Sequence, residues 1–282
     1  GVITADGNTN LAIHDPDFSY QQGSLLAIRI VRVMSVLLGA CTVYLTYLIG
    51  REAAPKRPEI ALGAAALNAF TPMFLFISGA VNNDNLAVPL ASLGLLLLIR
   101  MVTKVSKRPV FDTLLIGTVI GCAVLTKQGT IGLIPLAWGT FFIYQWVQVR
   151  DGLTEAGSGR FFSQVGRALG KSLLQFALLF IPIVLIAGWW YWRNIQLYGD
   201  LLGWSAFIAV LGQRETAASL AQLWDERWGF MLSYWGLFGG VNVPMWTWVY
   251  YVLNGLVIIA VPGFAIYAFQ VINRWRKKRS WR

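Results

Sequence analysis

The chain has 282 residues, of which 56% are hydrophobic and only 13% are charged, against roughly 25% charged residues in ordinary soluble chains. Its mean hydropathy of +0.58 leaves too little polar surface to cover a soluble core of this size. A soluble enzyme and a disordered chain are therefore excluded, and two cysteines and one histidine exclude a disulfide scaffold and the usual zinc sites. The composition predicts an all-α integral membrane protein.

Seven apolar runs are long enough, or nearly so, to cross a hydrocarbon layer of roughly 30 Å. In chain order they are Leu26–Ile49, Ile60–Val81, Leu86–Met101, Val110–Thr126, Thr130–Val149, Ser172–Trp192 and Trp246–Ile272. The segment Trp228–Val243 is also apolar, but its glycines favour a short interfacial or re-entrant piece. The sequence therefore predicts seven transmembrane helices rather than eight.

The net charge of +10 is explained by membrane topology. With alternate threading of the seven runs, the turns 51–59, 100–112 and 150–171 and the tail 273–282 lie on one side and hold 17 of the 23 Lys and Arg residues. Because cytoplasmic loops carry the excess of Lys and Arg, the N-terminus is expected outside and the C-terminus in the cytoplasm. A nucleic-acid partner is not predicted.

The chain is expected to divide at the membrane boundaries. We predict an outer segment at 1–25, a six-span core at 26–192, an outer aromatic-rich segment with interfacial helices at 193–245, a last span at 246–272 and a basic cytoplasmic tail at 273–282. Nine of the 13 Trp residues fall at or beyond the outer boundary. An aromatic belt alone would be more evenly distributed, so we expect an aromatic-lined structure in the segment 193–245.

Two short outer turns carry polar residues where an apolar chain should avoid them. Asn82, Asn83, Asp84 and Asn85 stand in a row between two spans, and Lys127 is the one basic residue of the next outer turn. A tight turn selects Asn and Asp on its own account, and a lysine at this depth can serve as an interfacial anchor. The alternative is a polar site at the membrane surface.

Further cations are expected at the same surface. Arg29 and Arg32 are spaced to share a helix face at the outer end of the first span, and Arg193 precedes Asn194 at the end of an aromatic run. Arg29 and Arg32 can also be read as snorkelling anchors or as lipid head-group contacts, and Arg193 as an anchor. Several cations around the Asp84 carboxylate would suit transfer from a phosphate-linked donor, since cations neutralise the leaving phosphate and a carboxylate accepts a proton.

Four short motifs follow one another along the chain. They are Arg32-Val33-Met34-Ser35, Pro72-Met73-Phe74-Leu75-Phe76-Ile77-Ser78 running into Asn82-Asn83-Asp84, Leu125-Thr126-Lys127, and Trp190-Tyr191-Trp192-Arg193-Asn194 with Tyr198-Gly199-Asp200. In this order the chain resembles the GT-C superfamily of multipass glycosyltransferases, which includes protein O-mannosyltransferases and aminoarabinose transferases. It is most similar to a bacterial branch of GT-C-like membrane proteins.

The resemblance implies inverting transfer of a sugar from a polyprenyl-phosphate donor to an acceptor at the outer face of a bacterial cytoplasmic membrane. Asp84 matches the acidic turn of the second outer loop, Lys127 and Arg193 would hold the donor phosphate, and the substrate contacts would include Asn82, Asn83, Asn194, Arg29 and Arg32. No cofactor is assigned, although Asp84 could bind a divalent cation through its oxygens or simply cap a helix.

One departure from the family bears on activity. The principal catalytic carboxylate of the family lies in the first outer loop, after an initial span, and Gly1–Leu25 is similar only to the end of that loop. Asp6, His14, Asp15 and Asp17 lie in this segment but match no family motif. We therefore expect the principal base upstream of Gly1, in a longer enzyme of which this is the C-terminal part, or else a chain that has lost the activity.

Two functions from different classes remain open. The first is a membrane glycosyltransferase, or its membrane core, whose lipid-linked donor enters from the bilayer. The second is a non-catalytic membrane subunit or lipid-binding scaffold that keeps the GT-C fold and works with other membrane subunits. A transporter is disfavoured, because no pair of interrupted helices marks a site at the membrane midplane.

Overall fold

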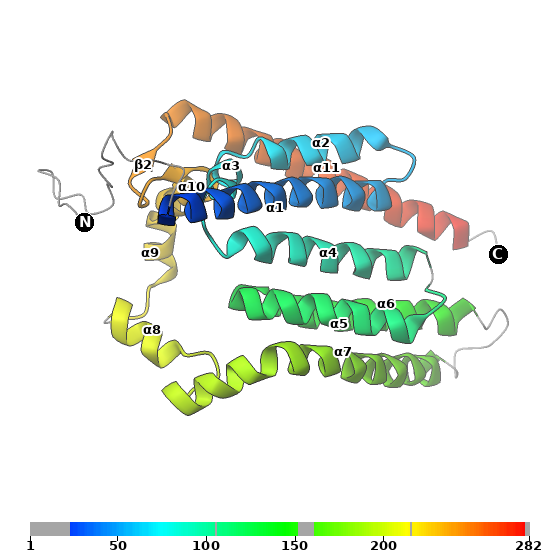
Figure 1. Ribbon diagram of the computed structural model, residues 1–282. Coiled ribbons are helices and arrows are strands. Elements are labelled where there is room, and N and C mark those ends of the chain that lie inside the picture. Colours follow the sequence, from blue (N-terminus) through cyan, green and yellow to red (C-terminus); the bar gives the residue numbers. More distant parts are fainter. Residues whose placement is uncertain (1–22, 105, 152–160, 215, 280–282) are drawn as a thin grey trace, which may run out of the picture. The chain divides into compact units, whose positions relative to one another are not determined.

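The computed structural model describes residues 23–104, 106–151, 161–214 and 216–279, and these residues are almost entirely helical (Figure 1). Six helices are long and apolar enough to cross a membrane, or seven if one bent pair counts as a span. The described residues form two compact units, which divide between residues 216 and 217. We call the first the N-terminal bundle and the second the C-terminal unit. The prediction of an all-α integral membrane protein is confirmed.

The N-terminal bundle contains the first six predicted spans. Its elements are α1 (Gly23–Ala53), α2 (Pro58–Ala69), α3 (Pro72–Ser78), α4 (Asp84–Thr103), α5 (Pro109–Thr126), the 3-10 helix η1 (Gln128–Gly132), α6 (Leu133–Asp151), α7 (Phe161–Tyr198) and α8 (Trp204–Leu211). Proline opens α2, α3 and α5. Proline suits this position because the first turn of a helix has no intrahelical partner for the missing N–H.

The second predicted span, Ile60–Val81, is not one straight helix. Helices α2 and α3 meet at an angle of 64° across Phe70 and Thr71. Pro72 is the physical reason: its ring disfavours helical backbone in the preceding residue, and Thr71 is extended, with φ −67° and ψ 119°. The described helices therefore contain one interrupted span, whereas a transporter site is typically formed by a pair of them.

The core of the bundle lies among α4, α5, α6 and α7, which run side by side in Figure 1. It is built from buried apolar side chains of these four helices: Leu98, Met101, Ile116, Ile120, Ala123, Val124, Leu133, Ala137, Phe141, Tyr144, Leu179, Ile183 and Ala187. Large apolar side chains on the outside of the bundle remain exposed, as expected for surfaces that face lipid.

Helices α5 and α7 approach each other through two glycines one turn apart. A Cβ atom at Gly117 would lie 2.6 Å from the Leu179 carbonyl oxygen and 2.6 Å from Cγ of Pro182. A Cβ atom at Gly121 would lie 3.1 Å from Cα of Ile183. This is the small-residue packing by which helices associate in membranes, where lipid provides no hydrophobic drive between them. Gly117 and Gly121 therefore fix the distance between the two helices that carry most of the site described below.

Ion pairs mark the two ends of the bundle. At one end, the Glu52 carboxylate of α1 accepts hydrogen bonds from Nε of Arg100 at 2.7 Å and Nζ of Lys104 at 2.6 Å. At the other end, Lys127 pairs with Asp84. The contacts show that the start of α4 and the end of α5 share one end, which we call the cavity end. The ends of α1 and α4 share the opposite end, which we call the basic end.

The C-terminal unit consists of α9 (Leu220–Asp225), α10 (Arg227–Trp235), a hairpin of β1 (Leu237–Phe238) and β2 (Val243–Pro244), and α11 (Thr247–Arg279). Leu237 lies opposite Pro244 and Phe238 opposite Val243 in the antiparallel pair. With nine residues, α10 is too short to cross the hydrocarbon layer. This agrees with the interpretation of Trp228–Val243 as a non-spanning piece, and α11 provides the last span.

Polar contacts hold this unit together. The buried Tyr250 hydroxyl donates to the Gly236 carbonyl at 2.5 Å and accepts from the Met245 N–H at 2.9 Å. One turn further along α11, Asn254 accepts a hydrogen bond of 3.0 Å from Nε1 of Trp235. The hairpin and α10 are thereby tied to the first turns of α11.

Candidate functional site

The turn before α4 is held by side chains of its own asparagines. Asn85 is buried, and its amide donates to the carbonyls of Ile77 at 3.0 Å and Ala80 at 2.8 Å. Oδ1 of Asn82 accepts from the N–H of Asp84 at 2.8 Å, the local bond by which asparagine favours turns. The asparagines expected from turn chemistry thus fix the position from which Asp84 opens α4.

Asp84 and Lys127 form an ion pair between the start of α4 and the end of α5. A second contact lies beside it, where Nδ2 of Asn83 donates to the Thr126 carbonyl at 3.1 Å. The carboxylate stands at a helix N-terminus and the ammonium at a helix C-terminus, which is the favourable orientation for both charges. The Lys127 and Asp84 side chains are 44% and 29% exposed, so the pair remains accessible to a ligand.

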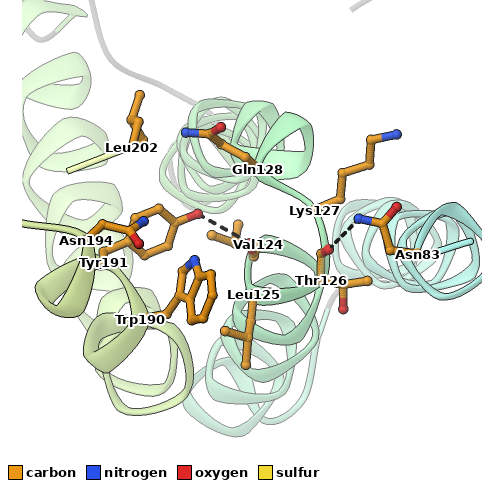
Figure 2. A pocket seen from close by; sticks show the side chains of 10 residues that line it. All are labelled: Asn83, Val124, Leu125, Thr126, Lys127, Gln128, Trp190, Tyr191, Asn194 and Leu202. Atoms are coloured by element: carbon orange, nitrogen blue, oxygen red, sulfur yellow. Dashed lines mark hydrogen bonds between the residues drawn. The ribbon is translucent and has the colours of Figure 1, made fainter. Parts of the chain in front are cut away.

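A cavity of about 190 Å³ lies next to this pair, between the end of α5 and the end of α7 (Figure 2). It is lined by residues 124–127, Gln128, Trp190, Tyr191 and Asn194, together with Asn83 and Leu202. Asn83 and Lys127 belong to its wall, but the Lys127 side chain points away from Trp190 and Tyr191, on the side of Asn83 (Figure 2). The Asp84–Lys127 pair therefore lies beside the cavity at the cavity end of the bundle.

The α7 wall of the cavity is fixed by two hydrogen bonds. The Tyr191 hydroxyl donates to the Val124 carbonyl of α5 at 3.3 Å. Asn194 is 5% exposed, and its Nδ2 donates to the Leu201 carbonyl at 3.3 Å. The first bond extends the α5–α7 contact of Gly117 and Gly121 to the cavity itself. The cavity therefore depends on the packing of these two helices.

The predicted arginines are distributed differently from the other site residues. The Arg193 guanidinium lies over the Trp190 ring, 5.1 Å from its centroid, so it touches the cavity wall through an aromatic side chain rather than lining the cavity. Arg29 and Arg32 are exposed residues near the start of α1 and do not line the cavity. The structure thus brings together Asn82, Asn83, Asp84, Lys127 and Asn194, and it leaves Arg29 and Arg32 outside the cavity wall.

Asp200, the last residue of the Tyr198-Gly199-Asp200 motif, has a structural role at the start of α8. Its carboxylate accepts from the Ser205 hydroxyl at 2.5 Å and from the N–H groups of Ser205, Leu202 and Trp204 at 2.9 to 3.0 Å. The Ser205 hydroxyl and the backbone N–H groups of this turn lower the pKa of Asp200 to about 2. The carboxylate therefore closes the turn between α7 and α8.

Among the polar and aromatic residues of the cavity wall, four are not predicted as site residues by the sequence: Thr126, Gln128, Trp190 and Tyr191. Trp190 and Tyr191 precede Asn194 by four and three positions, so helix periodicity places all three on one face. Once Asn194 is predicted as a site residue, the shared helix face identifies Trp190 and Tyr191 as further candidates. Asp6, His14, Asp15 and Asp17 lie outside the described residues.

The described residues do not fit a metal site. They contain no group of three or more His, Cys, Asp or Glu side chains that could hold an ion. Asp84 is already paired with Lys127, and one carboxylate with neutral amide oxygens makes a weak ligand set for a divalent cation. No chemical step is therefore assigned to a metal here.

The described residues thus form a multi-span helical bundle with an ion pair and a polar cavity at one end. The family model for dolichyl-phosphate-mannose-protein mannosyltransferase matches residues 10–199, which include α1 to α7 and the whole cavity wall except Leu202. The chain belongs to this family, a GT-C family of membrane glycosyltransferases. No curated protein and no solved structure matches the chain significantly.

Proposed function

We propose that the chain transfers a sugar from a polyprenyl-phosphate donor to an acceptor at the outer face of the membrane. The observation that carries the proposal is the Asp84–Lys127 pair on the edge of a polar cavity at the cavity end. The family's name supports the donor class, since dolichyl phosphate is a polyprenyl phosphate. A lipid-linked donor would reach this end of the bundle laterally, with its chain in the bilayer.

In the proposed reaction, the acceptor hydroxyl attacks C1 of the sugar from the face opposite the phosphate. The C1–O bond breaks, its electron pair stays on the polyprenyl phosphate, and the configuration at C1 inverts. Lys127 neutralises the leaving phosphate, and Arg193 adds positive charge from its place over Trp190. The hydroxyl proton passes to a carboxylate. Asp84 is the carboxylate in contact with Lys127, and it accepts this proton.

The ion pair suggests an order of events. While the site lacks a donor, Asp84 holds Lys127. A donor phosphate competes for the ammonium, and Asp84 is then released as an acceptor for a proton. Because the pair is partly exposed, breaking it costs little, in the range of about 0–1 kcal/mol found for surface pairs.

The test is transfer of radiolabelled mannose from polyprenyl-phosphate mannose in membranes that contain the chain. Asp84→Asn and Lys127→Ala are expected to lower transfer by about 10²- to 10⁴-fold, with unchanged protein levels. Matched controls are Glu59→Gln and Arg57→Ala, an exposed ion pair at the basic end, which should keep wild-type transfer. Wild-type rates in both site variants would refute the assignment. Donor binding without transfer by the wild-type chain would favour the scaffold function.

The outer location of the site needs its own test. Gly129 follows the Lys127 turn at the cavity end, and a Cβ atom there would meet no other atom within 4 Å, while Lys107 is exposed in the turn at the basic end. In a variant without native cysteines, Gly129→Cys should react with a membrane-impermeant maleimide on intact cells, and Lys107→Cys only after permeabilisation. Labelling with the opposite pattern would place the cavity on the cytoplasmic side.

A further inference from the structure

Two turns at the basic end form one strongly basic surface. The turn from α1 to α2 (residues 51–59) lies against the turn from α4 to α5 (residues 100–112), because Glu52 accepts hydrogen bonds from Nε of Arg100 at 2.7 Å and Nζ of Lys104 at 2.6 Å. We call them the paired turns. They hold seven Lys and Arg residues and three carboxylates. The fold, rather than proximity in the sequence, brings these charges together.

The carboxylates of the paired turns leave much of the positive charge uncompensated. One oxygen of Glu52 serves two cations, and Glu59 pairs with Arg57. The Asp112 carboxylate accepts a hydrogen bond from the Ser106 hydroxyl. Four exposed cations have no carboxylate partner among the described residues: Arg51, Lys56, Lys107 and Arg108. The surface therefore favours a ligand that carries negative charge.

The position of these cations in the bundle identifies the kind of anion. Glu52 and Arg100 lie in the last turns of two helices that can cross a membrane, which places them at the level of the lipid head groups. The Tyr47 hydroxyl accepts a hydrogen bond of 3.3 Å from Nη1 of Arg51, and Tyr44 is 61% exposed. Helix periodicity puts these three residues on one face of α1. That face leads from the charged surface toward the hydrocarbon layer.

We propose that the paired turns bind the head group of an anionic phospholipid, with an acyl chain along the Tyr44 and Tyr47 face of α1. A phosphate group offers several acceptor oxygens, and guanidinium and ammonium groups are strong donors to it. The hydrogen bond from Arg100 uses only its Nε donor, so its other four N–H donors are available to a phosphate. The proposal does not depend on sugar transfer, because the paired turns and the Asp84–Lys127 pair lie at opposite ends of the bundle.

The experiment titrates the full chain in neutral detergent with phosphatidylglycerol or phosphatidylcholine and counts bound lipids by native mass spectrometry. The wild type should bind phosphatidylglycerol in preference to phosphatidylcholine. Each cation near an anionic head group contributes about fivefold in affinity. The double replacement of Lys56→Gln and Lys107→Gln removes two exposed charges without breaking an ion pair, so it should weaken phosphatidylglycerol binding by about 10- to 30-fold.

The matched control is the double replacement of Arg167→Gln and Lys171→Gln. It removes the same charge from exposed positions near the start of α7, which also lies at the basic end (Figure 1) but packs on α5 and α6. This control should bind phosphatidylglycerol with nearly wild-type affinity. The unfolding midpoint of each variant without lipid verifies that it is folded.

Several outcomes would overturn the proposal. An equal loss in the two double variants would mean general attraction to a basic surface, and unchanged binding after replacement of Lys56 and Lys107 would exclude the paired turns. Displacement of the lipid by millimolar inorganic phosphate would show that a free phosphate suffices. Glu52→Gln tests the opposite sign, because it removes a negative charge from the same surface and should strengthen binding by about fivefold. Unchanged or weaker binding in that variant would contradict the role of the uncompensated charge.

Discussion

Replacing Gly117 with alanine should separate α5 from α7 and thereby disturb the cavity about three helical turns away. The new Cβ would lie 2.6 Å from the Leu179 carbonyl oxygen and from Cγ of Pro182. Neither atom belongs to a flexible side chain, so the helices must move apart. Overpacking of this kind typically costs about 1–3 kcal/mol. The gain in helix propensity from glycine to alanine, about 1 kcal/mol, opposes that cost and has to be removed from the comparison.

Gly139 on α6 provides the control, because a Cβ there meets nothing within 4 Å. Gly139→Ala gains the same propensity without a clash, so the difference between the two variants isolates the contact. Gly121→Ala should fall between them, since its nearest contact is 3.1 Å. We expect Gly139→Ala to be the most stable variant, Gly121→Ala the next and Gly117→Ala the least stable. The free energies of unfolding of the Gly139 and Gly117 variants should differ by about 1–3 kcal/mol.

The assay is thermal unfolding in nanodiscs, followed by tryptophan fluorescence at one fixed scan rate, because membrane proteins commonly unfold irreversibly. A change of 1 kcal/mol shifts the unfolding midpoint of a large domain by about 2–4 °C. The midpoints of the Gly139→Ala and Gly117→Ala variants should therefore differ by several degrees. Transfer activity should fall in the same order, since the bond from Tyr191 to Val124 joins the same two helices. Equal midpoints for the Gly117 and Gly139 variants would refute the close approach of α5 and α7.

Three further predictions concern other parts of the bundle. Glu52→Gln should lower stability by about 1 kcal/mol because it unpairs two cations from a largely buried carboxylate, whereas Glu59→Gln, at an exposed pair, should leave the unfolding midpoint unchanged. The pKa of Asp200 is lowered to about 2, so its contribution is fully present above the unfolded value near 3.8 and is lost as pH falls through about 2. As pH falls from about 3.8 to about 2, the backbone N–H groups of the α7–α8 turn should lose protection from hydrogen exchange. In Asp200→Asn the same groups should already lack this protection at pH 6. Gln175→Leu should cost about 1–3 kcal/mol by unpairing the Gln145 amide, and the double replacement with Gln145→Leu should cost less than the sum, as a double-mutant cycle in thermal unfolding would show.

The course of the helices is largely predictable from hydropathy. The fourth run, Val110–Thr126, ends at the same residue as α5, because Lys127 ends both the apolar run and the helix. Hydropathy does not register backbone direction, so it misses the 64° bend before Pro72. Hydropathy also predicts only the part of a helix that lies in the hydrocarbon layer. Helix α7 extends over Phe161–Tyr198, well beyond the predicted Ser172–Trp192, because backbone hydrogen bonds continue a helix outside that layer.

The site is predictable in part, and the limit is packing. Asp84 and Lys127 stand out because charge is costly in short turns of an apolar chain, but their contact depends on the antiparallel pairing of α4 and α5. Arg29 and Arg32 are predicted from their spacing, their place at the outer end of the first span and the family resemblance. None of these says which face of a helix packs against its neighbours. Both are exposed in α1, and the described buried positions of that helix begin one turn later, at Ser35. The glycines at 117 and 121 form a GxxxG pattern within a span, a packing signal that hydropathy does not contain.

The position of the ion pair at two helix ends leads to a last prediction, on donor affinity. Asp84 lies at the N-terminus of α4 and Lys127 at the C-terminus of α5, so each charge is stabilised by its own helix as well as by its partner. A donor phosphate must displace the carboxylate, and Asp84 therefore competes with substrate. Asp84→Asn should consequently bind polyprenyl phosphate more tightly than the wild type, by about 2- to 5-fold for a partly exposed pair, while transfer is lost. Weaker binding in this variant would mean that the carboxylate holds the donor rather than competing with it, and would refute the proposed exchange of Lys127 between Asp84 and phosphate.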